Sequence, residues 1–165
     1  GLHVHIGREI LGNDAEEKSE TIGKMLFLYH NFLKYNDMNI KIYGRRRGYS
    51  DNECQSDVSE AAKLLGSSVF KDKSIKDRVK DSLLACCRSQ RYFDINLTNN
   101  ATIEFRKGRG SINAERIAMV VEYSELICLY SKDTDWENIS YESFVDYIEN
   151  KATQQKLKKI IENYK

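Results

Sequence analysis

Proline is absent from the 165 residues, and no apolar run approaches the roughly 18 residues that a membrane-spanning helix needs. The charges nearly cancel, because 26 Lys and Arg stand against 25 Asp and Glu. This balance excludes wholesale attraction to nucleic acid or to a membrane, so any basic patch has to be local. The lack of proline, beside abundant Lys, Asn, Ile and Tyr, favours an AT-rich bacterial or phage gene.

The four cysteines lack the spacing of a metal site or of a disulfide framework. Cys86 and Cys87 are adjacent, Cys54 and Cys128 stand alone, and there is no C-x-x-C pair. We therefore expect idle or buried thiols in a reducing compartment. The first residues contain neither the basic nor the apolar region of a signal peptide. Together these features predict a cytoplasmic protein of a bacterial host cell.

Hydrophobic residues make up 41% of the chain and charged residues 31%, which excludes a disordered tail or a fibre. At this length we expect a single domain over residues 1–165. Period-two alternation predicts strands at Leu2–Ile6, 92–97 and Thr102–Arg106, of which the last two form a hairpin. Asn39–Tyr43 is expected to be a short extended piece.

Apolar residues at helical spacing predict the remaining elements. We expect helices at 21–35, 58–66, 75–88, 112–130, 139–150 and 153–164, with Asn113 capping the fourth. Trp136 is expected to be a packing anchor. The predicted fold class is therefore α+β, with a small antiparallel sheet covered by helices.

Two of the predicted strands present a polar pair on the face opposite their apolar residues. These pairs are His3 with His5, and Glu104 with Arg106. A half-exposed strand always shows polar residues to water, so one such pair is ordinary. Imidazole and carboxylate groups together suit a divalent metal, and a neighbouring arginine suits a phosphate. The third histidine, His30, is expected to be a packing or helix-surface residue.

The motifs around these pairs resemble one family. Residues 1–7, GLHVHIG, resemble the central strand of the amidoligases, which are carboxylate–amine ligases related to glutamine synthetase. Asn96-Leu-Thr-Asn, then Thr102-Ile-Glu-Phe-Arg106 and Ser111-Ile-Asn113 before an apolar helix, resemble a later motif of that family. The order and spacing agree over about residues 1–130.

The resemblance implies a fold like the C-terminal half of a glutamine-synthetase-like catalytic domain. An amidoligase-like core would span about residues 1–131, and a helical extension about 132–165. It further implies that His3 and Glu104 bind Mg²⁺ or Mn²⁺, while His5 and Arg106 contact ATP phosphates. The implied reaction activates a carboxylate as an acyl phosphate, which an amine then attacks to form an amide.

A basic loop between two glycines offers a further contact. Arg45, Arg46 or Arg47 would reach the nucleotide or the carboxylate substrate, and Tyr49 lies where the family often has a tyrosine near an arginine. The tyrosines beside this loop are also suited to stacking on bases. A solvated loop with no ligand is the simpler interpretation of the triple arginine.

The chain departs from the family because nothing precedes Gly1, where an earlier half supplies an acidic strand and further carboxylate ligands. One histidine and one glutamate are a poor magnesium site, since Mg²⁺ prefers near-octahedral oxygen ligands. Substitutes such as Glu9, Asp14, Glu16 and Glu17 look like ordinary solvated charge. We therefore expect that the missing half was removed or lies on another chain.

Two alternatives remain open at the level of sequence. A small protein of a phage or mobile element, cut down from this fold, would inhibit a host defence complex of the anti-CRISPR type. The loop Arg45–Arg47 would then contact a CRISPR effector or its guide RNA, and His3, His5 and Glu104 would support metal-dependent RNA cleavage. A purely structural partner of a larger enzyme is the third interpretation.

Overall fold

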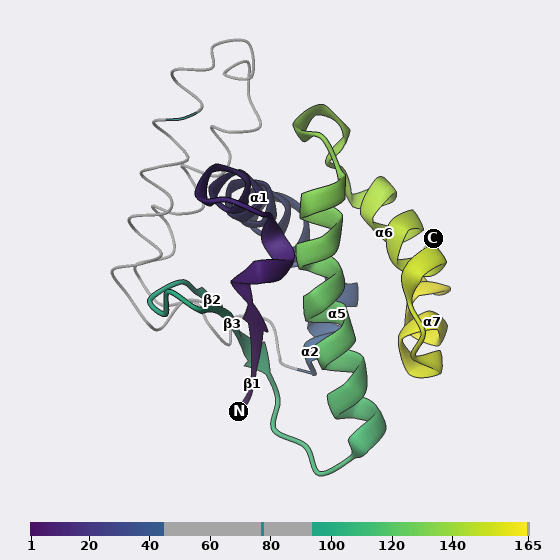
Figure 1. Ribbon diagram of the computed structural model, residues 1–165. Helices are drawn as coiled ribbons and strands as arrows, with labels where there is room; N and C mark the ends of the chain where they lie inside the picture. Colours follow the sequence, from purple (N-terminus) through teal and green to yellow (C-terminus); the bar gives the residue numbers. More distant parts are fainter. Residues whose placement is uncertain (45–76, 78–93, 165) are drawn as a thin grey trace.

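The computed structural model describes residues 1–44, 77 and 94–164 of the chain (Figure 1). In this part a three-stranded antiparallel sheet is combined with five α-helices, so the predicted α+β class is confirmed. The predicted helices at 58–66 and 75–88 fall outside the description except for one residue. None of the described helices has both the length and the apolar character that crossing a bilayer requires.

The sheet has the strand order β1-β3-β2, with β3 in the centre. Its strands are β1 (Leu2–Gly7), β2 (Ile95–Asn96) and β3 (Thr102–Gly108). The hairpin of β2 and β3 is confirmed. Of the expected strand at 92–97, only the two residues of β2 are described as strand. Val4, Ile103 and Phe105 are buried on the inner face, as the alternation predicts.

The turn of the hairpin is held by an arginine that follows β1. The Nη2 group of Arg8 donates to the carbonyl oxygens of Leu97 at 2.9 Å and Asn99 at 2.6 Å. The end of β1, the end of β2 and the start of β3 all meet at this side chain. The hydrogen bonds of Arg8 therefore fix the register of β1 against the hairpin at this end of the sheet. At the other end, a shift in the register occurs between Leu2 and Val4.

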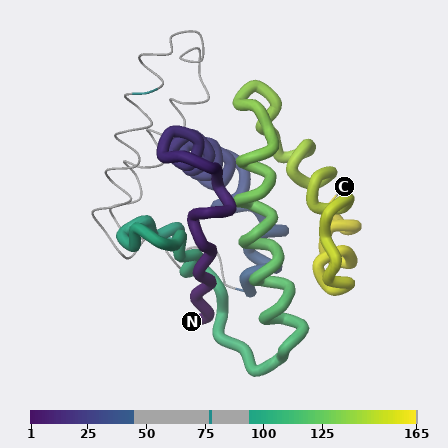
Figure 2. Tube along the Cα trace, in the orientation of Figure 1, coloured from purple at the N-terminus to yellow at the C-terminus, as the bar shows by residue number. Residues whose placement is uncertain are grey.

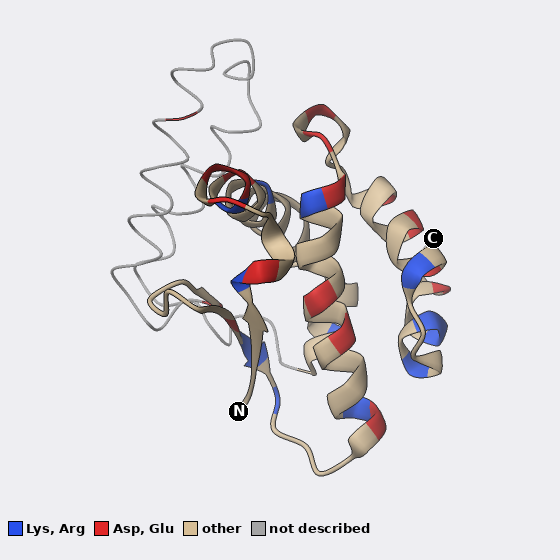
Figure 3. Cartoon of the chain, in the orientation of Figure 1, with Lys and Arg blue, Asp and Glu red and all other residues tan. Residues whose placement is uncertain are grey.

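The helix α5 is the centre of the molecule and contacts α1, α2, α6, α7 and β1 (Figure 1). The helices are α1 (Ala15–Leu28), α2 (Asp37–Tyr43), α5 (Ala114–Asp133), α6 (Tyr141–Lys151) and α7 (Gln155–Ile161). Figure 2 shows the N-terminal strand and the hairpin together on one side of α5, with α6 and α7 on the other. Charges of both signs are spread over α1, α5 and α6 (Figure 3).

Aromatic side chains fill the core around α5. Tyr123 packs edge-on against Tyr43 and at a tilt against Phe144, with ring centroids 5.5 and 6.0 Å apart. Trp136 is buried and its ring centroid lies 5.8 Å from that of Phe27, so the expected packing anchor is confirmed. Burial of large rings is the main source of stability in a core of this size.

Several helix boundaries differ from those expected. The helix expected at 21–35 begins earlier, at Ala15, because the side chain of Asp14 caps it by accepting from the backbone of Glu17. It passes into a π-helix at Tyr29–Leu33. The cap of α5 by Asn113 is confirmed, since its side chain accepts from the backbone of Arg116 at 2.9 Å.

The expectation of an extended piece at Asn39–Tyr43 is wrong, because these residues belong to the helix α2. Asn36 caps its start by accepting from the backbone of Met38 at 2.9 Å. Gly44 ends it in the left-handed conformation, with φ of 71°. The two end signals outweigh the short apolar–polar alternation inside the segment.

Candidate functional site

The two predicted polar pairs meet on the outer face of the sheet. His5 of β1 is the register partner of Glu104 in β3, and partners in adjacent strands point to the same face. His3 and Arg106 lie two residues further along and join them on that face. We call these four residues, His3, His5, Glu104 and Arg106, the outer-face cluster.

Glu104 is the centre of the outer-face cluster. Its Oε1 atom lies 2.8 Å from Nδ1 of His3 and 2.8 Å from Nη1 of Arg106. The Nε2 atom of His5 lies 3.7 Å from the same oxygen. The other oxygen, Oε2, accepts a hydrogen bond of 2.6 Å from the side chain of Asn96. One carboxylate therefore connects all three strands of the sheet.

The groups around Glu104 differ in their access to solvent. The Glu104 side chain is only 10% exposed, whereas His3 is 36% and His5 51% exposed. The Arg106 side chain lies between these values, at 24%. The cluster thus has a buried carboxylate at its base and imidazole edges that a ligand can reach.

Opposing effects act on the pKa of Glu104. Burial raises the pKa, because it removes water from the charged form. The hydrogen bonds from Asn96 and Arg106, the charge of Arg106 and that of His3 lower it. The net result is a pKa below the ordinary value, so Glu104 is a carboxylate at neutral pH and accepts from every donor around it.

Two supporting residues were not predicted from the sequence. Asn96 lies opposite Glu104 in β2 and holds one of its oxygens. The hydroxyl of Thr102 lies 3.3 Å from Nδ1 of His5, so it orients the ring with Nε2 toward Glu104. The alternation of β3, which puts Thr102 on the face of Glu104, was the signal that could have identified it.

His3 and Glu104 are the two residues of the outer-face cluster that could bind a metal ion together. Two ligands at right angles on an ion with bonds of about 2.1 Å are about 3 Å apart, which matches the separation of His3 and Glu104. However, the described residues contain no group of three or more His, Cys, Asp or Glu side chains that could hold a metal ion. A metal bound by His3 and Glu104 would therefore need further ligands beyond those that the described residues bring together.

The remaining predicted contacts do not join the cluster in the described structure. Asp14 and Glu17 are used at the start of α1, where Glu17 accepts from the backbone of Asn13 at 2.7 Å. Arg45, Arg46, Arg47 and Tyr49 lie outside the described residues, so the basic loop stays a prediction. His30 packs against Tyr29 with ring centroids 5.6 Å apart, consistent with the packing role expected for it.

Comparisons of the sequence with protein-family models and curated proteins, and of the structure with solved structures, found no match. Function is therefore inferred from the outer-face cluster itself and from the motifs that carry it.

Proposed function

We propose that this chain carries the metal- and phosphate-binding face of an ATP-dependent carboxylate–amine ligase. The observation that carries the proposal is the convergence of His3 and Arg106 on one oxygen of Glu104, each at 2.8 Å. The resemblance of both strands to amidoligase motifs supports it. The α+β fold with its small antiparallel sheet is compatible with the C-terminal half of a glutamine-synthetase-like domain.

The chemistry of the four groups suits phosphoryl transfer to a carboxylate. Such a reaction spreads negative charge over the transferred group, and guanidinium and imidazole donors stabilise that charge. Arg106 and His5 would bind the phosphates, with Thr102 keeping the imidazole of His5 in position. A divalent metal bound by His3 and Glu104 would supply further charge neutralisation.

Glu104 would have two roles that depend on its low pKa. As a carboxylate it is available as a metal ligand without first losing a proton. It also holds Arg106 in place until a phosphate competes for the guanidinium. To bind a metal through Oε1, Glu104 has to lose its ion pair with Arg106. The phosphate of the incoming nucleotide would then bind the guanidinium of Arg106, because it is a stronger partner.

The further metal ligands would come from residues outside the described part, or from a second chain. The carboxylate and amine substrates would then bind between the two halves, beside the exposed edges of His3 and His5. In this proposal the chain contributes part of an active site, and its partner is a half-domain that supplies the remaining ligands.

The test is a calorimetric titration of the chain with Mn²⁺, with and without a non-hydrolysable ATP analogue. We expect the metal to promote nucleotide binding. Glu104→Gln should weaken that binding by about tenfold or more, because it removes a charged ligand worth about 1.5–3 kcal/mol. Thermal unfolding of the variant should show that the nearly isosteric change leaves the fold intact.

The matched control is Glu16→Gln, which removes an exposed carboxylate from the start of α1. It should leave metal and nucleotide binding unchanged. Nucleotide binding that is independent of metal, or equal in the wild type and in Glu104→Gln, would refute the proposal. Metal binding with RNA cleavage and no nucleotide binding would instead favour the anti-CRISPR alternative, whose basic loop lies outside the described residues.

A further inference from the structure

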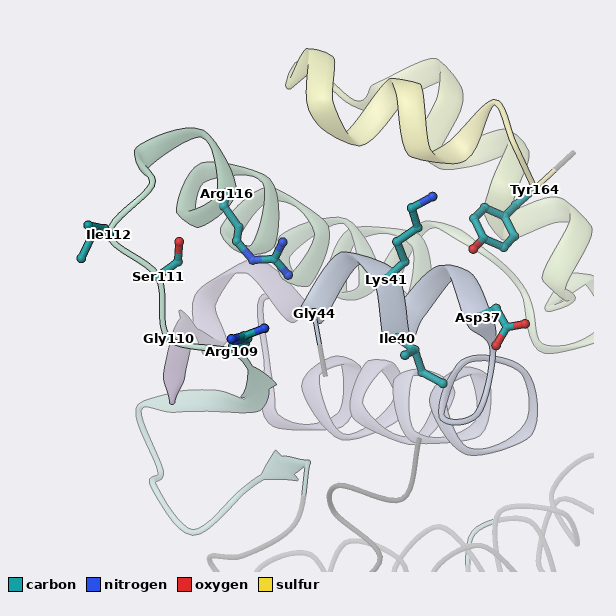
Figure 4. Close-up of a pocket in the computed structure, with 10 residues that line it drawn as sticks. All are labelled: Asp37, Ile40, Lys41, Gly44, Arg109, Gly110, Ser111, Ile112, Arg116 and Tyr164. Carbon is teal, nitrogen blue, oxygen red and sulfur yellow. The ribbon is translucent and has the colours of Figure 1, made fainter. Parts of the chain in front are cut away.

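A second hollow lies at the C-terminal end of α2, away from the outer-face cluster (Figure 4). It has a volume of about 1030 Å³ and is formed by α2, the segment after β3, the start of α5 and the end of the chain after α7. None of the four residues of the outer-face cluster lines it. We call it the α2–α5 pocket, and its chemistry is independent of the proposed ligase site.

Three cationic side chains from three different segments line the α2–α5 pocket. They are Lys41 of α2, Arg109 of the segment after β3, and Arg116 of the first turn of α5. Asp37 is the only carboxylate among the described lining residues. Bringing three cations to one hollow is electrostatically unfavourable without an anion, so the lining favours a ligand with more than one negative charge.

Backbone contacts hold the two arginines at the end of α2. The backbone N–H of Arg109 donates to the carbonyl oxygen of Tyr43 at 2.9 Å. Nη2 of Arg116 donates to the carbonyl oxygen of Ile42 over a long 3.4 Å. In Figure 4 both guanidinium groups lie at the end of the pocket beside Gly44, with Lys41 and Tyr164 toward the other end. Most of their N–H donors therefore remain available to a ligand.

Gly44 makes room for this arrangement. It has φ of 71°, a conformation that disfavours any side chain, and a Cβ at this position would overlap the guanidinium of Arg116. Glycine at position 44 therefore leaves room for the Arg116 guanidinium, and the positive φ independently favours glycine there.

We propose that the α2–α5 pocket binds the phosphate group of a small phosphorylated molecule. Two guanidinium forks match the oxygens of a phosphate dianion, and Lys41 adds a third charge. The volume greatly exceeds that of a phosphate, so the pocket has room for an organic body. Tyr164, which lies with Lys41 toward the other end of the pocket, offers that body an aromatic contact (Figure 4).

The test uses phenyl phosphate as the probe, because it combines a dianionic phosphate with an aromatic body. Calorimetry on the full chain should show one site. Phenyl sulfate has the same body and one charge, and inorganic phosphate lacks the body, so both should bind more weakly. The double variant R109Q/R116Q should weaken phenyl phosphate binding by about tenfold or more, given the strength of charge-assisted hydrogen bonds.

Two controls keep the result specific. The variant K132Q/K159Q removes two exposed charges elsewhere and should bind phenyl phosphate like the wild type. Arg106→Gln should do the same, which separates this pocket from the ligase site even if the ligase proposal fails. If R109Q/R116Q unfolds at a lower temperature than wild type, Lys41→Gln gives the same test without touching the contacts at the end of α2.

Absence of phenyl phosphate binding to the wild type would overturn the proposal. Equal binding by the wild type and the variants of the pocket would overturn it as well. Equal affinity for phenyl phosphate and inorganic phosphate would refute the organic body and leave a simple phosphate site.

Discussion

Glu104 has the least exposed side chain of the outer-face cluster, and the other three side chains gather around it. If the only role of Glu104 were to join the strands, the hydrogen bond from Asn96 and the ion pair with Arg106 would be enough. His5 adds little to that task, since its side chain is 51% exposed and lies 3.7 Å from the carboxylate. The exposed edges of His3 and His5 above the buried carboxylate are the feature that the proposed ligand site would use.

Gly44 leads to a prediction about stability at a single residue. Gly44→Ala combines a positive φ with overlap of Arg116, so we expect it to lower the free energy of unfolding by about 1–2 kcal/mol. Urea denaturation of the wild type and the variant measures this change. Binding of phenyl phosphate should weaken as well, because Arg116 has to move.

Gly110 provides the matched control for this substitution. It lines the same pocket, but the nearest atom to a Cβ there is 4.0 Å away. Gly110→Ala should therefore change the free energy of unfolding by less than about 0.5 kcal/mol. Equal costs for the two substitutions would show that neither the positive φ nor the approach of Arg116 constrains position 44.

At the residue scale, the members of the cluster and the supporting residue Thr102 could be predicted from alternation, whereas the support from Asn96 could not. The alternation of two strands placed His3 with His5 and Glu104 with Arg106, because period two is a local property of the chain. The contact between the pairs depends on the register of β1 against β3, which the sequence does not contain. Asn96 lies opposite Glu104 only because β2 pairs with β3 in the observed register, which the sequence does not contain either.

At the scale of elements, the capping residues at the ends of a segment determined its secondary structure where the apolar–polar alternation did not. Residues 39–43 alternate like a strand, yet the cap at Asn36 and the left-handed Gly44 make them a helix. The hairpin was predictable because two alternating runs lie four residues apart. The π-helix after α1 has no comparable sequence signal, since it continues the same apolar face.

One carboxylate connects α5 with the start of α7, and this connection is testable. Glu122 accepts from the backbone and hydroxyl of Thr153, both at 2.6 Å, and from the backbone of Gln154 at 2.9 Å. These N–H groups have no partner inside the helix, so the carboxylate acts as a cap supplied by another element. Glu122→Ala should cost about 1–2 kcal/mol of stability.

The loss should be local to α7. Amide hydrogen exchange of Glu122→Ala should be faster in α7 than in the wild type, while α1 and β3 keep their protection. Glu125→Ala is the matched control, because it removes an exposed carboxylate from the same helix without touching Thr153. If α7 exchanges equally fast in both variants, Glu122 does not hold the helix.

At the scale of the whole molecule, the two proposed sites depend on the same scaffold from different sides. The outer-face cluster lies on the sheet, and the α2–α5 pocket lies where α2 meets the start of α5. Phe105 points inward from β3 between the two cluster residues Glu104 and Arg106, so core and cluster share one strand. Substitutions in the core are therefore expected to disturb both sites, whereas those at one site leave the other intact.

The half-buried His30 makes the stability of the whole molecule depend on pH. Burial and the positive charges of Lys34 and Lys107 lower its pKa to about 4, against the opposing charge of Asp94. In the unfolded chain the pKa returns to about 6.5. Between these values the unfolded state binds a proton that the native state does not. The free energy of unfolding therefore falls as the pH is lowered from about 6.5 to about 4.

His30→Gln removes the group whose proton binding differs between the native and the unfolded state. Between pH 7 and pH 4.5 we expect the wild type to lose about 2 kcal/mol more stability than the variant, measured by urea denaturation at both values. Any change in packing caused by the substitution acts at both pH values and cancels in the comparison. Glu104, whose pKa is also lowered, adds a loss at lower pH that both proteins share. Identical pH dependence in the wild type and the variant would mean that His30 stays accessible to protons in the native state.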